Sequence, residues 1–455
     1  MSTGLILFVL MAAMEIALAV ATCLKKSDMK VWRRSRLFVR IAQIVIAVAA
    51  ILLPLGQKWR FAGVLVTLAL LSFITALAIL IRRRKEEGAV KRSKVVVSCV
   101  MSLLLIGFAL VPAFVFTGYK GLPVSGKYAV NTSSAILVDA SRTDPFETDG
   151  SFREVPVHFY YPETAGDGAE RFPLVVFSHG AFGYYQSNTS TYMELASNGY
   201  VVAALDHPHH AFFTKDTGGK TVIVDMDFMN TALTLNSDMG AEKLYGLYTD
   251  WMALRTADMG FAVDEIKAAA AAGSVDACWQ VSDKMADGVH AALALTDETK
   301  IGLMGHSMGG ATSVELGRTR DDITAVIDLD GTMLGEYAGV KDGELIVRSD
   351  PYTVPVLEFN NWGSYNDTEE YTAQGGLHPN VELMKRASAG FSVAVRGTEH
   401  MDFTDLPLLS PFLGKMLGSG ERDTAETMEI VNSLVLGFFN TYLKGEGVFT
   451  ADSIL

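Results

Sequence analysis

The amino-acid sequence predicts an α/β domain, with a mostly parallel sheet covered by helices on both faces, preceded by an all-α membrane region of about four helices. Three observations predict this arrangement: long apolar runs near the N-terminus, a reversal of charge near Tyr119, and alternating strand and helix patterns after it. The mean hydropathy of +0.25 and the hydrophobic share of 49% are therefore averages over two different parts.

The charge balance divides the chain. Residues 1–120 carry 17 Lys and Arg against four Asp and Glu, a net +13, and the remainder carries 21 against 47, a net −26. The acidic part is long enough to bury a substantial core. Its charge argues against a nucleic-acid partner, because phosphate binding requires a cationic surface. Cys23, Cys99 and Cys278 are too few and too scattered for a disulfide framework or a thiolate metal site.

We expect a transmembrane region at residues 1–118. Its spans are predicted at about 4–24, 41–57, 61–81 and 95–117. Three of these runs are long enough to cross about 30 Å of hydrocarbon as a helix, whereas the second, bounded by Arg40 and Lys58, lies at the short end of that range. Glu15 interrupts the first run, and we expect it to face a neighbouring helix without a catalytic role.

Basic residues gather in the first and third connections between these spans. The positive-inside tendency therefore predicts that both connections are cytoplasmic and that the acidic domain is extracytoplasmic, in a multi-pass protein of the plasma membrane. If 41–57 does not span, the acidic domain still lies outside. A cleaved signal peptide or a lipoprotein signal ending at Cys23 is the alternative for residues 1–24, but no basic residue precedes the run and no clear small-x-small site follows it.

The acidic domain, expected at 119–455, alternates strands with helices. Strands are predicted at 154–161, 173–177, 199–205, 300–304, 323–329, 354–359 and 391–395. Helices are predicted at 187–197, 248–272, 282–295, 308–318 and 424–443. Short continuous apolar strands are typical of a sheet buried on both faces, which binds ligands beyond the carboxyl ends of its strands. Residues 206–250 show little regular helix, and we interpret them as a lid or insertion.

A candidate nucleophile follows one of these strands. Residues 305–310 read Gly-His-Ser-Met-Gly-Gly between a strand and a helical pattern, so the glycines permit a tight turn that exposes the Ser307 hydroxyl. A serine needs a base, and in folds of this type the order is serine, acid, histidine. Beyond Ser307 the candidates are His400, which follows a strand, and His378, which precedes a proline in a Gly-rich loop. We favour His400.

The remaining catalytic groups are an acid and an oxyanion hole. Asp330, at the end of a strand and before a glycine, is the favoured acid, with Asp328 and Asp367 as alternatives. Two backbone N–H groups should stabilise the oxyanion, and we expect them from Met308 and Ala181. We interpret the neighbouring His179 as a residue that braces this loop.

The sequence resembles the α/β-hydrolases, and within them the platelet-activating-factor acetylhydrolase group with its esterase and polyester-hydrolase relatives. The matching stretches are SRTDPF and VPVHFYYP within 141–162, PLVVFSHG at 173–180, LASNGYVVAALDH at 195–207, GHSMGGAT at 305–312, IDLDG at 327–331 and RGTEHMDFTD at 396–405. The resemblance covers most of 135–445 and implies the triad Ser307, Asp330 and His400, with Ala181 and Met308 as oxyanion donors. The membrane region is not covered, and residues 208–250 depart from the pattern.

These observations predict a membrane-anchored serine hydrolase of carboxylic esters, with short acyl chains on lipid-like or amphiphilic alcohols as substrates. We expect Phe182, His207 and Trp362 to contact the substrate and the bilayer to be the other partner. A peptidase or acyltransferase with the same triad, or a catalytically idle receptor or assembly protein, is the alternative. No cofactor or metal is expected: the histidines at 207, 209 and 210 lack the following Asp-His of metallo-hydrolases, and no calcium-loop pattern occurs.

Overall fold

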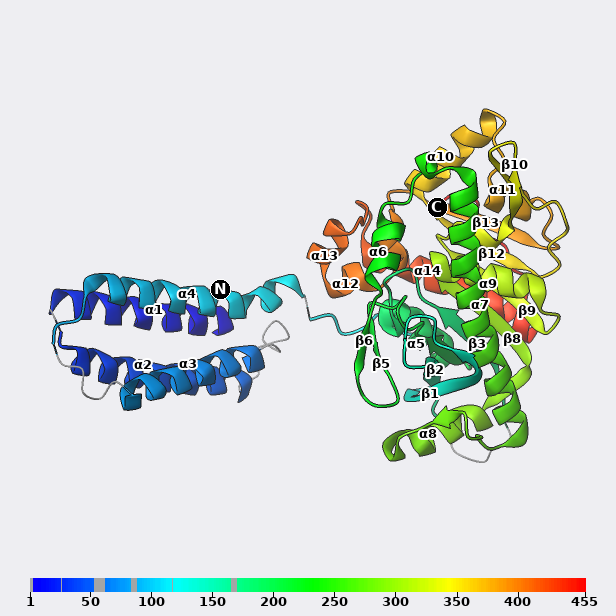
Figure 1. The fold of residues 1–455 in the computed structure, drawn as a ribbon. Helices are drawn as coiled ribbons and strands as arrows, with labels where there is room; N and C mark the ends of the chain where they lie inside the picture. The colour runs from blue at the N-terminus through cyan, green and yellow to red at the C-terminus, as the bar shows by residue number, and fades with distance from the viewer. Residues whose placement is uncertain (1–2, 26, 53–61, 83–87, 117, 165–169) are drawn as a thin grey trace. The chain divides into compact units, whose positions relative to one another are not determined.

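The structure is a computed structural model that describes residues 3–25, 27–52, 62–82, 88–116, 118–164 and 170–455 (Figure 1). The chain divides into two compact units. One consists of Met1–Lys120 with Leu408–Leu413, and the other of Gly121–Pro407 with Gly414–Leu455. Each unit is described by itself below.

The first unit contains four helices that are long and apolar enough to cross a membrane. They are α1 (Thr3–Leu24), α2 (Met29–Leu52), α3 (Ala62–Arg82) and α4 (Arg92–Val115). The second helix differs from the predicted span 41–57: it begins at Met29, and residues 53–57 lie outside the described residues. Arg40, expected to bound this span, lies instead in the middle of α2.

A buried ion pair explains how a charged residue fits there. Arg40 Nη1 lies 2.6 Å from Glu15 Oε1 on α1, and both side chains are at most 5% exposed. Gln43 donates to the same carboxylate at 2.7 Å, and Arg40 Nη2 donates to the Ser102 hydroxyl of α4. Ionisable groups inside membrane helices pair in this way because an isolated charge is costly in hydrocarbon. Glu15 thus faces neighbouring helices and joins α1, α2 and α4.

The described residues that flank the first and third connections lie at the same end of this unit. Backbone hydrogen bonds join them: the Met29 N–H donates to the Gly88 carbonyl at 2.9 Å, and the Val90 N–H donates to the Ser27 carbonyl at 3.2 Å. The Gly88 N–H also donates to the Asp28 carboxylate at 3.1 Å. The residues flanking the first and third connections are therefore neighbours, as the positive-inside assignment requires.

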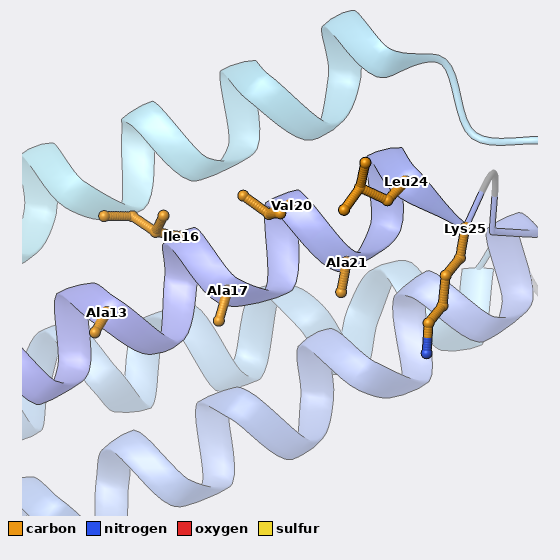
Figure 2. A pocket seen from close by; sticks show the side chains of 7 residues that line it. All are labelled: Ala13, Ile16, Ala17, Val20, Ala21, Leu24 and Lys25. Atoms are coloured by element: carbon orange, nitrogen blue, oxygen red, sulfur yellow. The ribbon is translucent and has the colours of Figure 1, made fainter.

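The outer face of α1 carries an apolar hollow of about 560 Å³. Figure 2 shows the side chains that line it, which are Ala13, Ile16, Ala17, Val20, Ala21, Leu24 and Lys25. The larger of these side chains are about half exposed or more, Leu24 reaching 78%. No polar group other than Lys25 contributes a side chain, so the hollow is suited to hydrocarbon.

The second unit is built on a sheet of nine strands within its described residues, in the order β13-β12-β9-β8-β3-β4-β2-β1-β7. The strands are β1 (Val130–Thr143), β2 (Phe152–Pro162), β3 (Phe172–Ser178), β4 (Val201–Leu205), β7 (Trp279–Gln280), β8 (Thr296–His306), β9 (Ile323–Leu329), β12 (Val356–Asn361) and β13 (Gly390–Val395). The first six strands in that order pair in parallel, and β2, β1 and β7 are added by antiparallel pairings. The predicted fold class, a mostly parallel α/β sheet, is confirmed.

Helices cover both faces of this sheet (Figure 1). They include α5 (Thr189–Ser197), α7 (Ala241–Ala272), α8 (Asp283–Ala294), α9 (Met308–Thr319), α10 (Trp362–Ala373), α11 (Pro379–Met384) and α14 (Thr424–Phe439). Two short helices, α12 (Leu406–Leu409) and α13 (Pro411–Met416), include residues of the segment Leu408–Leu413, which belongs to the other unit. Successive residues of β3 enter different cores: Leu174 and Val176 belong to one apolar cluster, and Val175 and Phe177 to the other. Alternation across a doubly covered strand accounts for its continuous apolar sequence.

The insertion is more regular than predicted. It contains a hairpin of β5 (Phe213–Lys215) and β6 (Thr221–Ile223), then α6 (Met226–Leu233), and α7 begins at Ala241 rather than at 248. The Asp225 side chain caps α6 by accepting a hydrogen bond from the Phe228 N–H at 2.8 Å. A second hairpin, of β10 (Tyr337–Lys341) and β11 (Glu344–Val347), was also not predicted.

Candidate active site

Ser307 occupies the turn between β8 and α9. Its φ of 55° is rare for a residue with a side chain, and it is partly exposed between the buried residues His306 and Met308. The turn requires glycine on both sides. A Cβ at Gly305 would lie 2.1 Å from the Gly309 backbone, and one at Gly309 would lie 1.9 Å from the Ser178 carbonyl oxygen. The close packing of this turn against β3 therefore holds Ser307 in its strained conformation.

His400 and Asp330 form a hydrogen-bonded pair at the same edge of the sheet. His400 Nδ1 lies 2.6 Å from Asp330 Oδ2, and the His400 ring lies 4.6 Å from that of His306, next to Ser307. Burial would lower the pKa of His400, but the hydrogen bond and charge of Asp330 outweigh it and raise that pKa. The imidazolium form is therefore stabilised, as a general base beside a serine requires.

Asp330 is held by a residue that the sequence did not indicate. The Asn361 backbone N–H donates to Asp330 Oδ1 at 2.6 Å, and the Asn361 side-chain amide donates to Oδ2 at 2.8 Å. Asp330 itself has a φ of 59°, and its side chain is 3% exposed. Asn361 ends β12, which pairs in parallel with β9. Only the order of the strands brings Asn361 and Asp330 together.

The alternative residues lie elsewhere. Asp328 is fully buried and accepts a hydrogen bond from the Gly331 N–H; burial, with Glu358 and Asp330 nearby, raises its pKa well above the usual value. Asp367 is exposed on α10. His378 caps the start of α11, and its Nδ1 is buried without a hydrogen-bond partner among the described residues. Neither Asp328 nor Asp367 takes the place of Asp330 as the partner of His400, and His378 does not take the place of His400.

The two predicted oxyanion donors belong to Met308, which follows Ser307, and to Ala181, in the loop after β3. Met308 is the first residue of α9, so its N–H has no partner within the helix. In the described part of the chain the Ala181 N–H has no acceptor, whereas Phe182 and Gly183 use theirs. The loop is close to the nucleophile, because a Cβ at Gly180 would lie 3.2 Å from the Ser307 Cβ.

An apolar cluster from the insertion packs beside these donors. Its buried members are Val224, Phe228, Trp251, Met252, Met308 and Ala311. Ala181 and Phe182 pack against it, and the Phe182 ring lies 5.5 Å from that of Phe228. Trp362 lies at the start of α10, where it stacks on Tyr365 and carries the Arg396 guanidinium 5.0 Å from its ring. Phe182 and Trp362 are both partly exposed.

Comparison with known proteins identifies the family. The model of the family described as platelet-activating factor acetylhydrolase, isoform II, matches residues 154–450, which include most of β2, the strands β3 to β13, and Ser307, Asp330 and His400. The chain belongs to this family.

Two members of the acetylhydrolase family are similar over much of this chain. The platelet-activating factor acetylhydrolase of Cavia porcellus is 24% identical over 302 residues, covering 64% of this chain and 61% of that protein. The enzyme of Gallus gallus is 22% identical over 308 residues, covering 60% and 63%. The chain thus spans about three fifths of the length of these relatives. A ferulic acid esterase from Streptomyces cinnamoneus shares the fold, with a TM-score of 0.53 and 21% identity over 73% of this chain and 95% of that one.

One residue expected to contact substrate in this acetylhydrolase-family chain does not. His207 is fully buried, because Nε2 bonds the Ser178 hydroxyl at 2.9 Å and Nδ1 bonds Asp258 at 3.1 Å. Both ring nitrogens are therefore hydrogen-bonded in the interior, and the burial of His207 contradicts its predicted contact with the substrate. His207 follows β4, and a residue at the end of a strand was expected to line the substrate cleft. Its hydrogen bond to Asp258, 51 residues away in the sequence, instead holds the ring in the interior.

Three buried histidines below this site should make the fold acid-sensitive. Burial, with the Arg255 charge second, lowers the pKa of His207 to about 4 and lowers the pKa of His179 and His210 as well. The folded state then binds fewer protons than the unfolded state below pH 6.5, so this stability is complete above pH 6.5 and is lost as the pH falls. His207 alone accounts for about 3 kcal/mol by pH 4.

We expect Tm to fall steadily between pH 6.5 and 4.5, measured on the purified full chain. A His210→Phe variant should show a shallower fall, and replacement of the exposed His290 by Gln should leave the slope unchanged. A Tm independent of pH in this range would contradict the interpretation.

Proposed function

We propose that this protein is a membrane-anchored serine hydrolase that cleaves carboxylic esters through an acyl-enzyme. The observation that carries the proposal is the 2.6 Å hydrogen bond between His400 Nδ1 and Asp330, beside a serine held at a φ of 55°. A serine nucleophile, a histidine base and a carboxylate that orients the histidine form the catalytic triad found in many enzymes of acyl transfer. Membership of the acetylhydrolase family supports the same chemistry.

The reaction follows from the roles of these groups. His400 Nε2 accepts the Ser307 proton as Oγ attacks the ester carbonyl carbon, and the oxyanion is stabilised by the N–H groups of Ala181 and Met308. The imidazolium then gives its proton to the alcohol, which leaves. Water, deprotonated by the same histidine, attacks the acyl-serine and releases the acid. Asp330 holds the imidazole in the required tautomer throughout.

Short acyl groups on lipid-like alcohols are the substrates that we propose. The apolar cluster of the insertion, with Phe228 and Trp251, packs directly against Met308 and Ala181, which limits the room for an acyl chain beside the oxyanion donors. The relatives are named for platelet-activating factor. A lipid-like substrate agrees with the proposed anchoring of the hydrolase unit to a membrane. Hydrolysis should fall with acyl length across an ester series. Product analysis with an added alcohol or amine separates hydrolysis from acyl transfer.

We further propose that the four helices cross the plasma membrane and leave the hydrolase unit outside. Support comes from their length and apolar character, from the exposed apolar face of α1, and from the basic connections gathered at one end. A membrane-impermeant fluorophosphonate applied to intact cells should therefore label the wild-type protein as strongly as it does after permeabilisation. Labelling that requires permeabilisation would reverse the orientation without affecting the proposed chemistry.

A further inference from the structure

Arg255 is a buried cation for which the described residues provide no carboxylate partner. It lies on α7, is fully buried, and forms no ion pair with any described residue, whereas the neighbouring Asp258 is bound by Arg153 and Arg142. Burying a guanidinium is costly unless its donors are satisfied. Burial is the main cause that lowers the pKa of Arg255 to about 9, which leaves the side chain charged at neutral pH.

Arg255 directs its donors at the loop that follows β3. Nη1 donates to the His179 carbonyl at 2.5 Å and lies 3.5 Å from the Ser178 hydroxyl. Nη2 donates to the Gly180 carbonyl at 3.4 Å, and Nε donates to His210 Nδ1 at 3.3 Å. One guanidinium therefore binds two consecutive carbonyls of the loop that carries the Ala181 N–H.

His179 supports the same peptide. Its Nε2 accepts a hydrogen bond from the His207 backbone N–H at 3.2 Å, so the ring proton lies on Nδ1, which donates to the Gly180 carbonyl at 2.6 Å. Burial lowers the pKa of His179 well below its usual value, in keeping with this neutral tautomer. The Gly183 N–H is a third donor to the same carbonyl, at 3.0 Å.

These contacts fix the direction of the Ala181 N–H. The bond between Gly180 and Ala181 is trans, since no cis peptide occurs among the described residues. In a trans peptide the carbonyl and the N–H lie in one plane and point in opposite directions. Donors that hold the Gly180 carbonyl on the α7 side therefore direct the Ala181 N–H away from α7, and this N–H has no acceptor within the described chain.

We infer that Arg255 and His179 are positioning residues that orient the Ala181 N–H for the oxyanion. The inference rests on the proposed function, since an oxyanion forms only if Ser307 attacks an acyl carbon. Because the N–H acts on charge that develops in the transition state, misorientation lowers kcat and leaves KM nearly unchanged. A purely structural role for the same contacts would instead lower the amount of active protein and affect all substrates equally.

The test compares an oxoester with its thionoester, in which sulfur replaces the carbonyl oxygen, on the full chain in detergent micelles. Sulfur is a weak hydrogen-bond acceptor, so the thionoester gains little from the oxyanion hole. Arg255→Met should lower kcat for the oxoester about a hundredfold, which is the effect of losing one oxyanion donor. For the thionoester, the fall in kcat should be several times smaller. Arg255→Lys, which keeps the charge but not the two-pronged geometry, should lose less. Concentrations are set by active-site titration.

Matched variants keep the test decisive. Arg142→Met removes another cation from Asp258 without touching the loop, and should change neither kcat nor the oxoester preference. If Arg255→Met does not fold, His179→Leu and His179→Asn replace it, because only asparagine keeps a donor near Nδ1. Equal losses for both esters, a change confined to KM, or full activity would overturn the inference. Wild-type turnover that persists in Ser307→Ala would instead refute the proposed function.

Discussion

Replacing Ser307 with alanine is expected to lower kcat for ester hydrolysis by about 10⁴-fold to 10⁶-fold, the range for loss of a serine nucleophile. The remaining rate would come from the oxyanion donors and from binding, which the change leaves in place. The measurement is turnover of a short-chain chromogenic ester by the purified full chain. Covalent labelling by a fluorophosphonate should disappear in the same variant, because the phosphonyl group attaches to Ser307 Oγ.

A nearby serine provides the matched control. Ser313 lies six residues further along the chain, on α9, is fully buried, and its hydroxyl donates to the Gly309 carbonyl. Ser313→Ala should keep both turnover and labelling. Labelling that survives in Ser307→Ala would show that another residue is the nucleophile.

Replacing Asp330 with asparagine is expected to lower kcat by about 10⁴-fold, because asparagine favours the wrong imidazole tautomer. The pH profile should change as well. Hydrolysis needs neutral His400, so kcat/KM rises with pH through the pKa of that residue. Burial opposes the charged ring, and the Asp330 hydrogen bond and charge overcome it. Without the carboxylate the pKa of His400 falls, and the acidic limb of the profile should move to lower pH.

Asp328→Asn and Asp367→Asn are the comparisons. Asp328 has a raised pKa and accepts a hydrogen bond from the Gly331 N–H, whereas His400 Nδ1 bonds Asp330, so an amide at position 328 should be tolerated. Asp367 is exposed. Activity retained in Asp330→Asn and lost in Asp367→Asn would move the acid to the segment after β12.

Local patterns predicted much of the hydrolase unit. The strands β3, β4, β8 and β9 each begin and end within four residues of the predicted bounds, because a strand buried on both faces has a continuous apolar sequence. The turn at Ser307 was readable because its two glycines are required locally. β1 was not predicted: it lies towards the antiparallel edge, where its burial alternates and its sequence is polar.

Contacts between distant segments could not be predicted. Asn361 meets Asp330 across 31 residues, and Arg255 meets His179 across 76. Each depends on the order of the strands or on the docking of α7, which no local pattern contains. The start of α2 was mispredicted for a similar reason. Arg40 was expected to lie outside the span because it is charged, and its neutralising partner, Glu15, lies 25 residues earlier in the sequence.

The pair formed by Arg40 and Glu15 bears on how the chain is made. A lone arginine in the middle of a membrane helix costs about 3 kcal/mol to insert, and Arg40 is at the middle of α2. The helix that supplies the neutralising carboxylate is synthesised first. On the membrane topology proposed above, we therefore expect α1 and α2 to enter the bilayer together as a hairpin, after Arg40 has been synthesised and can pair with Glu15.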